Sequence, residues 1–126
     1  MGFSRDHTTK AQHNGLVASQ LLAGKSAYDW AVVALFYMAV HLVDAQAARK
    51  RRHPGGHAAR GQFVFENWPE MEPTYTALHQ RSEQARYECG LMGPSDVTNA
   101  QQYVNEIKKV IETRPVAQGR SARCMF

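Results

Sequence analysis

The sequence is poor in the features that mark secreted, membrane-spanning or disulfide-stabilised proteins. It has two cysteines, Cys89 and Cys124, which can form at most one bridge. Its N-terminus, MGFSRDHTTK, has no apolar signal core. The longest uncharged apolar run, from Trp30 to Val43, is shorter than the roughly 20 residues that cross a bilayer. We therefore expect a cytoplasmic protein with free thiols and no membrane association.

Motifs that hold nucleotides, nucleophiles or metals are also missing. The chain contains no G-x-x-x-x-G-K-[ST], G-x-G-x-x-G or G-x-S-x-G sequence. His53 and His57 have a metal-like spacing, but Pro54, Gly55 and Gly56 between them predict a turn instead of one helix. The cysteines lie too far away to complete such a site. We expect no metal and no cofactor.

The chain has the composition of one globular domain, and its positive charge is localised. Hydrophobic residues make up 44% and charged residues 21% of its 126 residues. The net charge of +4 falls to +1 without residues 114–126, and the run Arg49–Arg52 alone supplies four positive charges. This distribution suits local contact with phosphates better than the coating of a long duplex.

Apolar periodicity predicts helices only, and no strand-like alternation is present. The spacing predicts helices over residues 8–22, 28–50, 57–65 and 72–89 and from the expected N-cap Ser95 to Pro115. In the last of these, residues spaced by 3, 4, 3 and 4 form one apolar stripe: Val97, Ala100, Val104, Ile107 and Ile111. Residues 28–50 are apolar on almost every side, which is typical of the central helix of a bundle. We expect a flexible N-terminus over 1–8, a helical domain over 9–113 and a basic, disordered tail over 114–126.

A few polar residues interrupt the apolar helices. Tyr37, His41 and Asp44 are spaced by four and three residues and share one helix face with Trp30. His41 needs a polar partner, which Asp44 or an arginine from another helix can provide. The group is either a buried polar network that fixes helix packing or part of a functional site.

Arg86 borders the apolar stripe of residues 75–89. A guanidinium at such a border can lie along apolar surface and present its N–H groups to a carboxylate or a phosphate. Two interpretations follow from the residues alone: an ion pair with Asp44 or Glu88, or a phosphate-binding site.

Three short segments resemble the HEPN superfamily of small bacterial helix bundles. They are Leu35–His41, His57–Arg60 and Ser82–Tyr87, followed by a helix after Pro94–Ser95, and the resemblance covers roughly residues 9–113. It implies an all-α, four- to five-helix up-and-down bundle that often forms a homodimer. Many members are metal-independent ribonucleases, frequently toxins paired with a nucleotidyltransferase-type antitoxin, whereas others bind RNA or protein partners without catalysis.

The resemblance places Arg86 where the ribonucleases carry an arginine followed four to six residues later by a histidine. No histidine follows Arg86 in this chain. The first hypothesis is an RNA-directed protein with His41, His57 and Arg86 as catalytic residues in a groove between the helices over 28–50 and 72–89. The residues expected to bind substrate are Arg60, Tyr37, Tyr87 and Asp44. The alternatives are a non-catalytic interaction or dimerisation module and a small-molecule sensor.

Overall fold

The protein is a bundle of α-helices, as the sequence predicts. The computed structural model describes residues 4–24, 27–87 and 92–117, and within these ranges it contains no strand. The five α-helices are α1 (Ser4–Ala23), α2 (Tyr28–Arg49), α3 (His57–Asn67), α4 (Glu72–Tyr87) and α5 (Pro94–Thr113), with a short 3₁₀ turn, η1 (Pro69–Met71), before α4.

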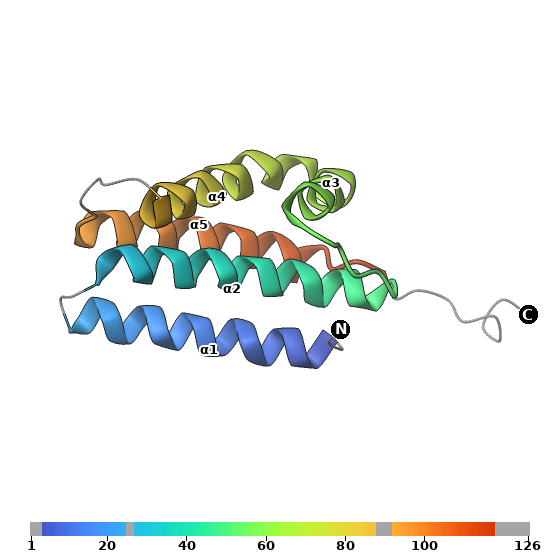
Figure 1. Cartoon of the computed structure of the whole chain (residues 1–126). Helices are drawn as coiled ribbons and strands as arrows, with labels where there is room; N and C mark the ends of the chain where they lie inside the picture. The colour runs from blue at the N-terminus through green and yellow to red at the C-terminus, as the bar shows by residue number, and fades with distance from the viewer. Residues whose placement is uncertain (1–3, 25–26, 88–91, 118–126) are drawn as a thin grey trace, which may run out of the picture.

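Helix α2 is the centre of the bundle. Figure 1 shows α1 along one side of α2 and α4 and α5 along the other, with the short α3 lying across one end. The chain reverses direction from α1 to α2 and from α4 to α5, so these neighbours are antiparallel. This arrangement confirms a helical bundle.

The composition of α2 explains its central position. Half of its 22 residues are buried, among them Leu35, Phe36 and Val43, which are completely inaccessible to solvent. Burying apolar side chains of this size stabilises the fold by about 1.5–3 kcal/mol each. Helix α2 is also long and apolar enough to cross a membrane, but 61% of its apolar window is buried against the other helices, as in the core helix of a bundle.

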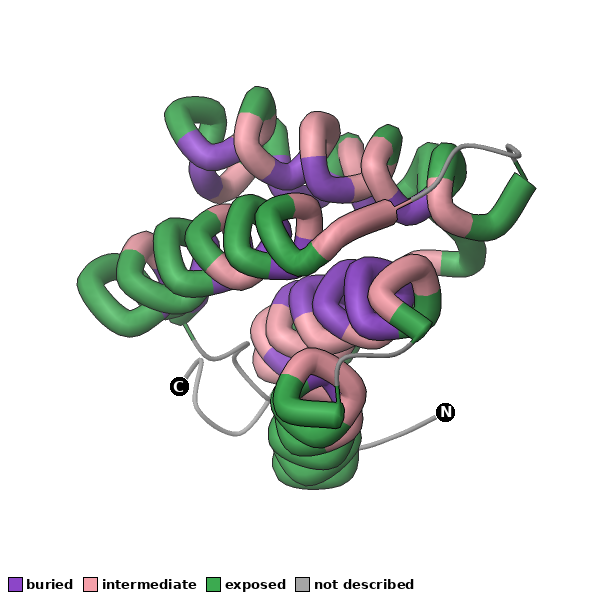
Figure 2. The backbone as a smooth tube through the Cα atoms, turned by 90° about the vertical axis from the view of Figure 1, so that its left-hand side faces the viewer, coloured by how far each residue is buried: buried purple, intermediate pink, exposed green. Residues whose placement is uncertain are grey.

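Helix α1 covers one side of α2 and begins earlier than predicted. It starts at Ser4, so residues 4–8, expected to be flexible, belong to a helix. Its packing is close at Gly15, where an added Cβ would lie 2.9 Å from the sulfur of Met38. Its outer surface faces solvent, as Figure 2 shows, and Ala11 and Ala18 are its only buried residues. Helix α1 is therefore held mainly by α2, with a smaller contact to α5.

Helices α4 and α5 place their predicted apolar stripes in the core. Tyr75, Leu78 and Ser82 of α4 are buried, as is the complete predicted stripe of α5: Val97, Ala100, Val104, Ile107 and Ile111. The predicted N-cap Ser95 was wrong. Gly93 caps α5, and its backbone N–H donates to the Asp96 carboxylate over 2.8 Å. Cys89 lies outside the described residues.

The beginning of the predicted basic tail packs on the domain. Val116 is buried, its backbone N–H donates to Gln46, and its carbonyl accepts from Arg49 Nε at 2.8 Å. The Trp68 indole N–H donates to the carbonyl of Arg114. Residues 114–117 are therefore part of the folded unit, contrary to the predicted disordered tail. Residues 118–126 lie outside the described part of the chain.

Candidate functional site

The candidate site lies on one side of α2, where α3 and α4 bring two histidines together. His57 is the first residue of α3 and His79 lies in the middle of α4. Their ring centroids are 4.5 Å apart. Both rings pack near Phe36 of α2, and His79 stacks on it with a centroid distance of 4.8 Å and an angle of 6°. The buried phenyl ring of Phe36 therefore contacts both imidazoles.

One of these imidazoles is oriented by a carboxylate one helical turn further along α4. His79 Nε2 lies 2.9 Å from an oxygen of Glu83, the i,i+4 neighbour on the same helix. Glu83 is more than half exposed, so this pair borders solvent. The contact fixes the ring plane of His79 relative to His57.

Arg86 holds its guanidinium against two tyrosines beside this pair. Its Nη1 donates to the hydroxyl of Tyr37 over 3.0 Å, and its Nη2 donates to the hydroxyl of Tyr87 over 2.6 Å. The guanidinium also lies 4.8 Å from the centroid of the Tyr87 ring and 5.9 Å from that of Tyr37. Because these contacts are with neutral groups, the positive charge remains available to an anion. Arg86 itself is exposed.

The histidines and Arg86 belong to one electrostatic unit, which we call the His57 site: His57, His79, Arg86, Tyr37 and Tyr87. Partial burial lowers the pKa of His57, and the positive charges of His79, Arg60 and Arg86 lower it further. His57 is therefore mainly neutral at pH 7 and is suited to accept a proton.

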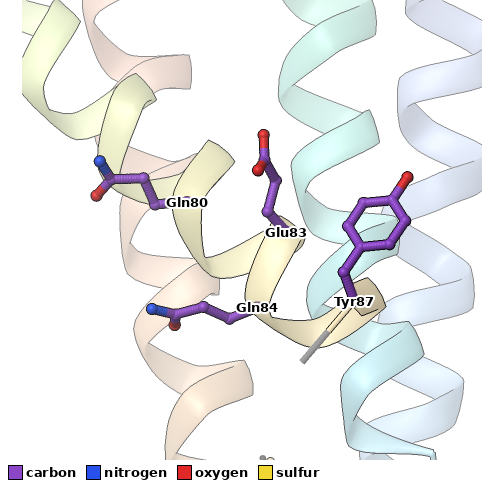
Figure 3. Close-up of a pocket in the computed structure, with 4 residues that line it drawn as sticks. All are labelled: Gln80, Glu83, Gln84 and Tyr87. Carbon is purple, nitrogen blue, oxygen red and sulfur yellow. The ribbon is translucent and has the colours of Figure 1, made fainter. Parts of the chain in front are cut away.

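A shallow pocket on α4 adjoins the His57 site. It has a volume of about 300 Å³ and is lined by Gln80, Glu83, Gln84 and Tyr87. In Figure 3, Gln80 and Gln84 project to one side of α4, whereas Glu83 and Tyr87 project to the other. Glu83 contacts His79 and Tyr87 contacts Arg86, so the pocket wall is continuous with the site. Amide and phenol groups of this kind can hydrogen-bond and stack on a nucleobase.

Asp44 and Arg60 form a buried ion pair and not a substrate-binding pair. Arg60 Nε and Nη2 donate to the two carboxylate oxygens of Asp44 over 2.8 and 3.2 Å. Both residues are buried. They interact electrostatically with the phenol of Tyr75, whose pKa is raised by burial. The expectation that Asp44 and Arg60 contact substrate is thus not supported, because both side chains are buried and hydrogen-bonded to each other.

His41 does not join Arg86, contrary to the sequence-based hypothesis. Its Nδ1 lies 2.9 Å from Nδ1 of His7 on α1, and the two rings are stacked with centroids 5.2 Å apart. Burial lowers the pKa of His41, and the charges that act on it are those of His7, Asp44, Lys10 and Arg60, with no effect from Arg86 among them. His41, Tyr37 and Trp30 do line one pocket, as their spacing predicts, but this pocket lies between α1 and α2.

One of the two predicted partners of Arg86, Asp44, was wrong. Asp44 pairs with Arg60, and Glu88 lies outside the described part of the chain. Of the three residues expected to be catalytic, His57 and Arg86 interact electrostatically, whereas His41 contacts His7 of α1. Tyr37 and Tyr87, expected to bind substrate, are the two residues that hold Arg86.

His79 is the site residue that sequence reasoning missed. It precedes Arg86 by seven residues, which is two helical turns, so the two side chains share a face of α4. The Glu83 carboxylate four residues after His79 is a second signal on that face. Comparison of the chain with models of known protein families, with curated proteins and with solved structures found no match.

Proposed function

We propose that this chain is an RNA-directed protein of the HEPN type and that it cleaves RNA without a metal ion at the His57 site. The observation that carries the proposal is the pair of imidazoles with ring centroids 4.5 Å apart beside the guanidinium of Arg86. This combination supplies a proton acceptor, a proton donor and a fixed cation at a surface that substrate can reach.

RNA cleavage by internal transesterification needs those three groups. A base removes the proton of the ribose 2′-hydroxyl, and the resulting oxygen attacks the adjacent phosphorus. An acid protonates the 5′-oxygen as its bond to phosphorus breaks, which leaves a 2′,3′-cyclic phosphate. A cation stabilises the negative charge that develops on the phosphate oxygens.

We assign these roles by position. His57, whose pKa is lowered by burial and by its cationic neighbours, is the base. His79, oriented by Glu83, is the acid. Arg86, held by Tyr37 and Tyr87, contacts the phosphate, and the pocket over Gln80 and Gln84 accepts the neighbouring base.

The test is cleavage of a labelled single-stranded RNA by the purified full chain in EDTA. We expect His57→Gln and His79→Gln each to slow cleavage by about 10²–10⁴-fold, the usual contribution of a general acid or base. His53→Gln is the matched control, because His53 is an exposed histidine four residues before His57.

One further substrate and one further variant separate this reaction from a contaminating nuclease. An RNA with a single 2′-deoxy position should resist cleavage at that position, since the nucleophile is missing. Arg86→Ala should abolish cleavage while the helical circular dichroism stays unchanged. If Arg86→Ala, His57→Gln or His79→Gln retains full activity, the site assignment is wrong.

A second candidate function is a non-catalytic interaction or dimerisation module. It is favoured by the apolar pocket of about 320 Å³ between α1 and α2 and by Trp30, which is 59% exposed at its edge. Exposed aromatic residues of this kind are typical of protein interfaces. In that case Trp30→Ser converts a dimer, or a complex with a nucleotidyltransferase-type antitoxin, to monomer in sedimentation experiments, and RNA stays intact in EDTA.

A further inference from the structure

A second group of polar residues lies between α1 and α2 and does not include His57, His79 or Arg86. His7 of α1 and His41 of α2 approach through their Nδ1 atoms, which are 2.9 Å apart. Asp44, one turn after His41, completes the group, and one ligand atom from each of the three residues lies within 4.8 Å of the others. The three side chains come from positions 34 and 3 residues apart in the sequence.

The separation of the two nitrogens fits two ligands of one transition-metal ion. Nitrogen ligands of Zn²⁺ lie about 2.0–2.1 Å from the metal, so two of them are about 2.9 Å apart at a right angle and about 3.3 Å apart at a tetrahedral angle. A hydrogen bond is the other interaction that permits 2.9 Å, and it needs one of the two Nδ1 atoms to carry the proton.

The surroundings also resemble those of a metal site. Asp44 is fixed by two hydrogen bonds from Arg60, and ligating carboxylates are commonly oriented by such outer contacts. Both histidines are partly buried and Asp44 is buried, so the three ligand atoms lie in a partly enclosed space between α1 and α2.

We propose that His7, His41 and Asp44 bind one Zn²⁺ ion that ties α1 to α2. Two imidazoles and one carboxylate are a donor set suited to Zn²⁺ and related divalent transition metals and unsuited to Mg²⁺, which prefers oxygen ligands. We assign the fourth ligand to a water molecule, because His41 also lines an open pocket between α1 and α2 through which water reaches its side chain. Because α1 packs mainly on α2, through one face, a metal bridge between the two helices would hold it in place.

The test is titration of the metal-free full chain with Zn²⁺ by calorimetry. We expect one equivalent to bind, with His7→Ala and His41→Gln each weakening the affinity at least tenfold. His13→Ala is the matched control: His13 is an exposed histidine of the same helix, and its loss should leave the affinity unchanged. Circular dichroism of each variant verifies that the helices are retained.

Two further measurements decide the coordination and its effect. Co²⁺ in place of Zn²⁺ should give visible absorption bands with intensity typical of low coordination number in the wild type and not in His7→Ala. Zn²⁺ should slow amide hydrogen exchange in α1 more than in α5. Mg²⁺ should do neither.

The proposal is overturned if Zn²⁺ does not bind or if His13→Ala weakens binding as much as His7→Ala. The histidine pair is then a hydrogen bond alone. This outcome is independent of the proposed RNA cleavage, which is measured in EDTA and depends on His57, His79 and Arg86. A chain that binds Zn²⁺ and leaves RNA intact would retain this inference and lose the proposed function.

Discussion

The buried ion pair between Asp44 and Arg60 gives the sharpest prediction about stability. The side chains are 12% and 10% exposed, and two hydrogen bonds of 2.8 and 3.2 Å join them. Replacing Asp44 with alanine leaves a guanidinium in the interior with no counter-charge. Two unit charges about 4 Å apart attract by about 4 kcal/mol at an effective dielectric constant of about 20.

Measured losses agree with this magnitude. Removing one partner of a buried pair costs about 3–5 kcal/mol, because the remaining charge stays desolvated. We therefore expect Asp44→Ala to lower the free energy of unfolding by about 3–5 kcal/mol, a large part of the roughly 5–15 kcal/mol of a typical domain. The double variant Asp44→Ala, Arg60→Met should lose much less than the sum of the single variants, since no unpaired charge remains.

Urea unfolding followed by far-ultraviolet circular dichroism measures these values, with a chelator present so that metal binding does not contribute. The pair Arg52–Glu66 is the matched control, because its atoms are 3.8 Å apart and its side chains are 52% and 46% exposed. Breaking it should cost at most about 1 kcal/mol. If Asp44→Ala costs no more than this control, the pair does not stabilise the core as argued.

Four other predictions concern packing, chain ends and pH. Leu78→Ala should lower the free energy of unfolding in urea by about 2–5 kcal/mol, because Leu78 is fully buried. Leu16 is 56% exposed, so Leu16→Ala should change this free energy by at most about 0.5 kcal/mol. Truncation after residue 113 should lower the free energy of unfolding by about 2–4 kcal/mol, because buried Val116 and its two backbone hydrogen bonds are lost. Truncation after residue 117 keeps these contacts, so the melting temperature should not change. Arg51→Gly should raise the unfolding free energy by about 1 kcal/mol, since Arg51 has a left-handed φ of 57° at the end of α2; a loss would contradict this. The pKa of His57 is lowered in the folded protein, so the unfolded chain binds more protons at this residue. The free energy of unfolding should therefore fall as the pH drops through 6.5, the ordinary pKa of histidine. His57→Gln should reduce this pH dependence between pH 7 and 5.

The helices could be read from the sequence because their signals are local. The all-round apolarity of residues 28–50 predicts a central helix, and the 3-4-3-4 spacing of α5 predicts its buried face, since both patterns follow from 3.6 residues per turn. The predicted ends were less accurate. Ser95 and Gly93 both satisfy the local rules for an N-cap, and only the Asp96 carboxylate bonded to the Gly93 N–H distinguishes them.

The candidate site could be predicted only in part. His57, Arg86, Tyr37 and Tyr87 drew attention as polar groups on or beside apolar faces, whereas His79 did not, because nothing in its neighbours indicates that α3 would bring His57 against it. The choice of partner for a buried charge is likewise non-local. Several basic residues of the sequence are potential ion-pair partners for Asp44. Because α3 crosses the end of α2, Arg60 is the one that pairs with it.

Sequence periodicity alone therefore determined that the chain is helical, which helix is central and which faces are buried, because side-chain direction along a helix is fixed by backbone geometry. The tertiary structure decided which polar groups meet. His41 contacts His7 of α1 and not Arg86. Residues 114–117 pack on α2 instead of extending into solvent. Such contacts depend on how helices are placed relative to one another, and pairs separated by 34 or 67 residues leave no periodic signal in the chain.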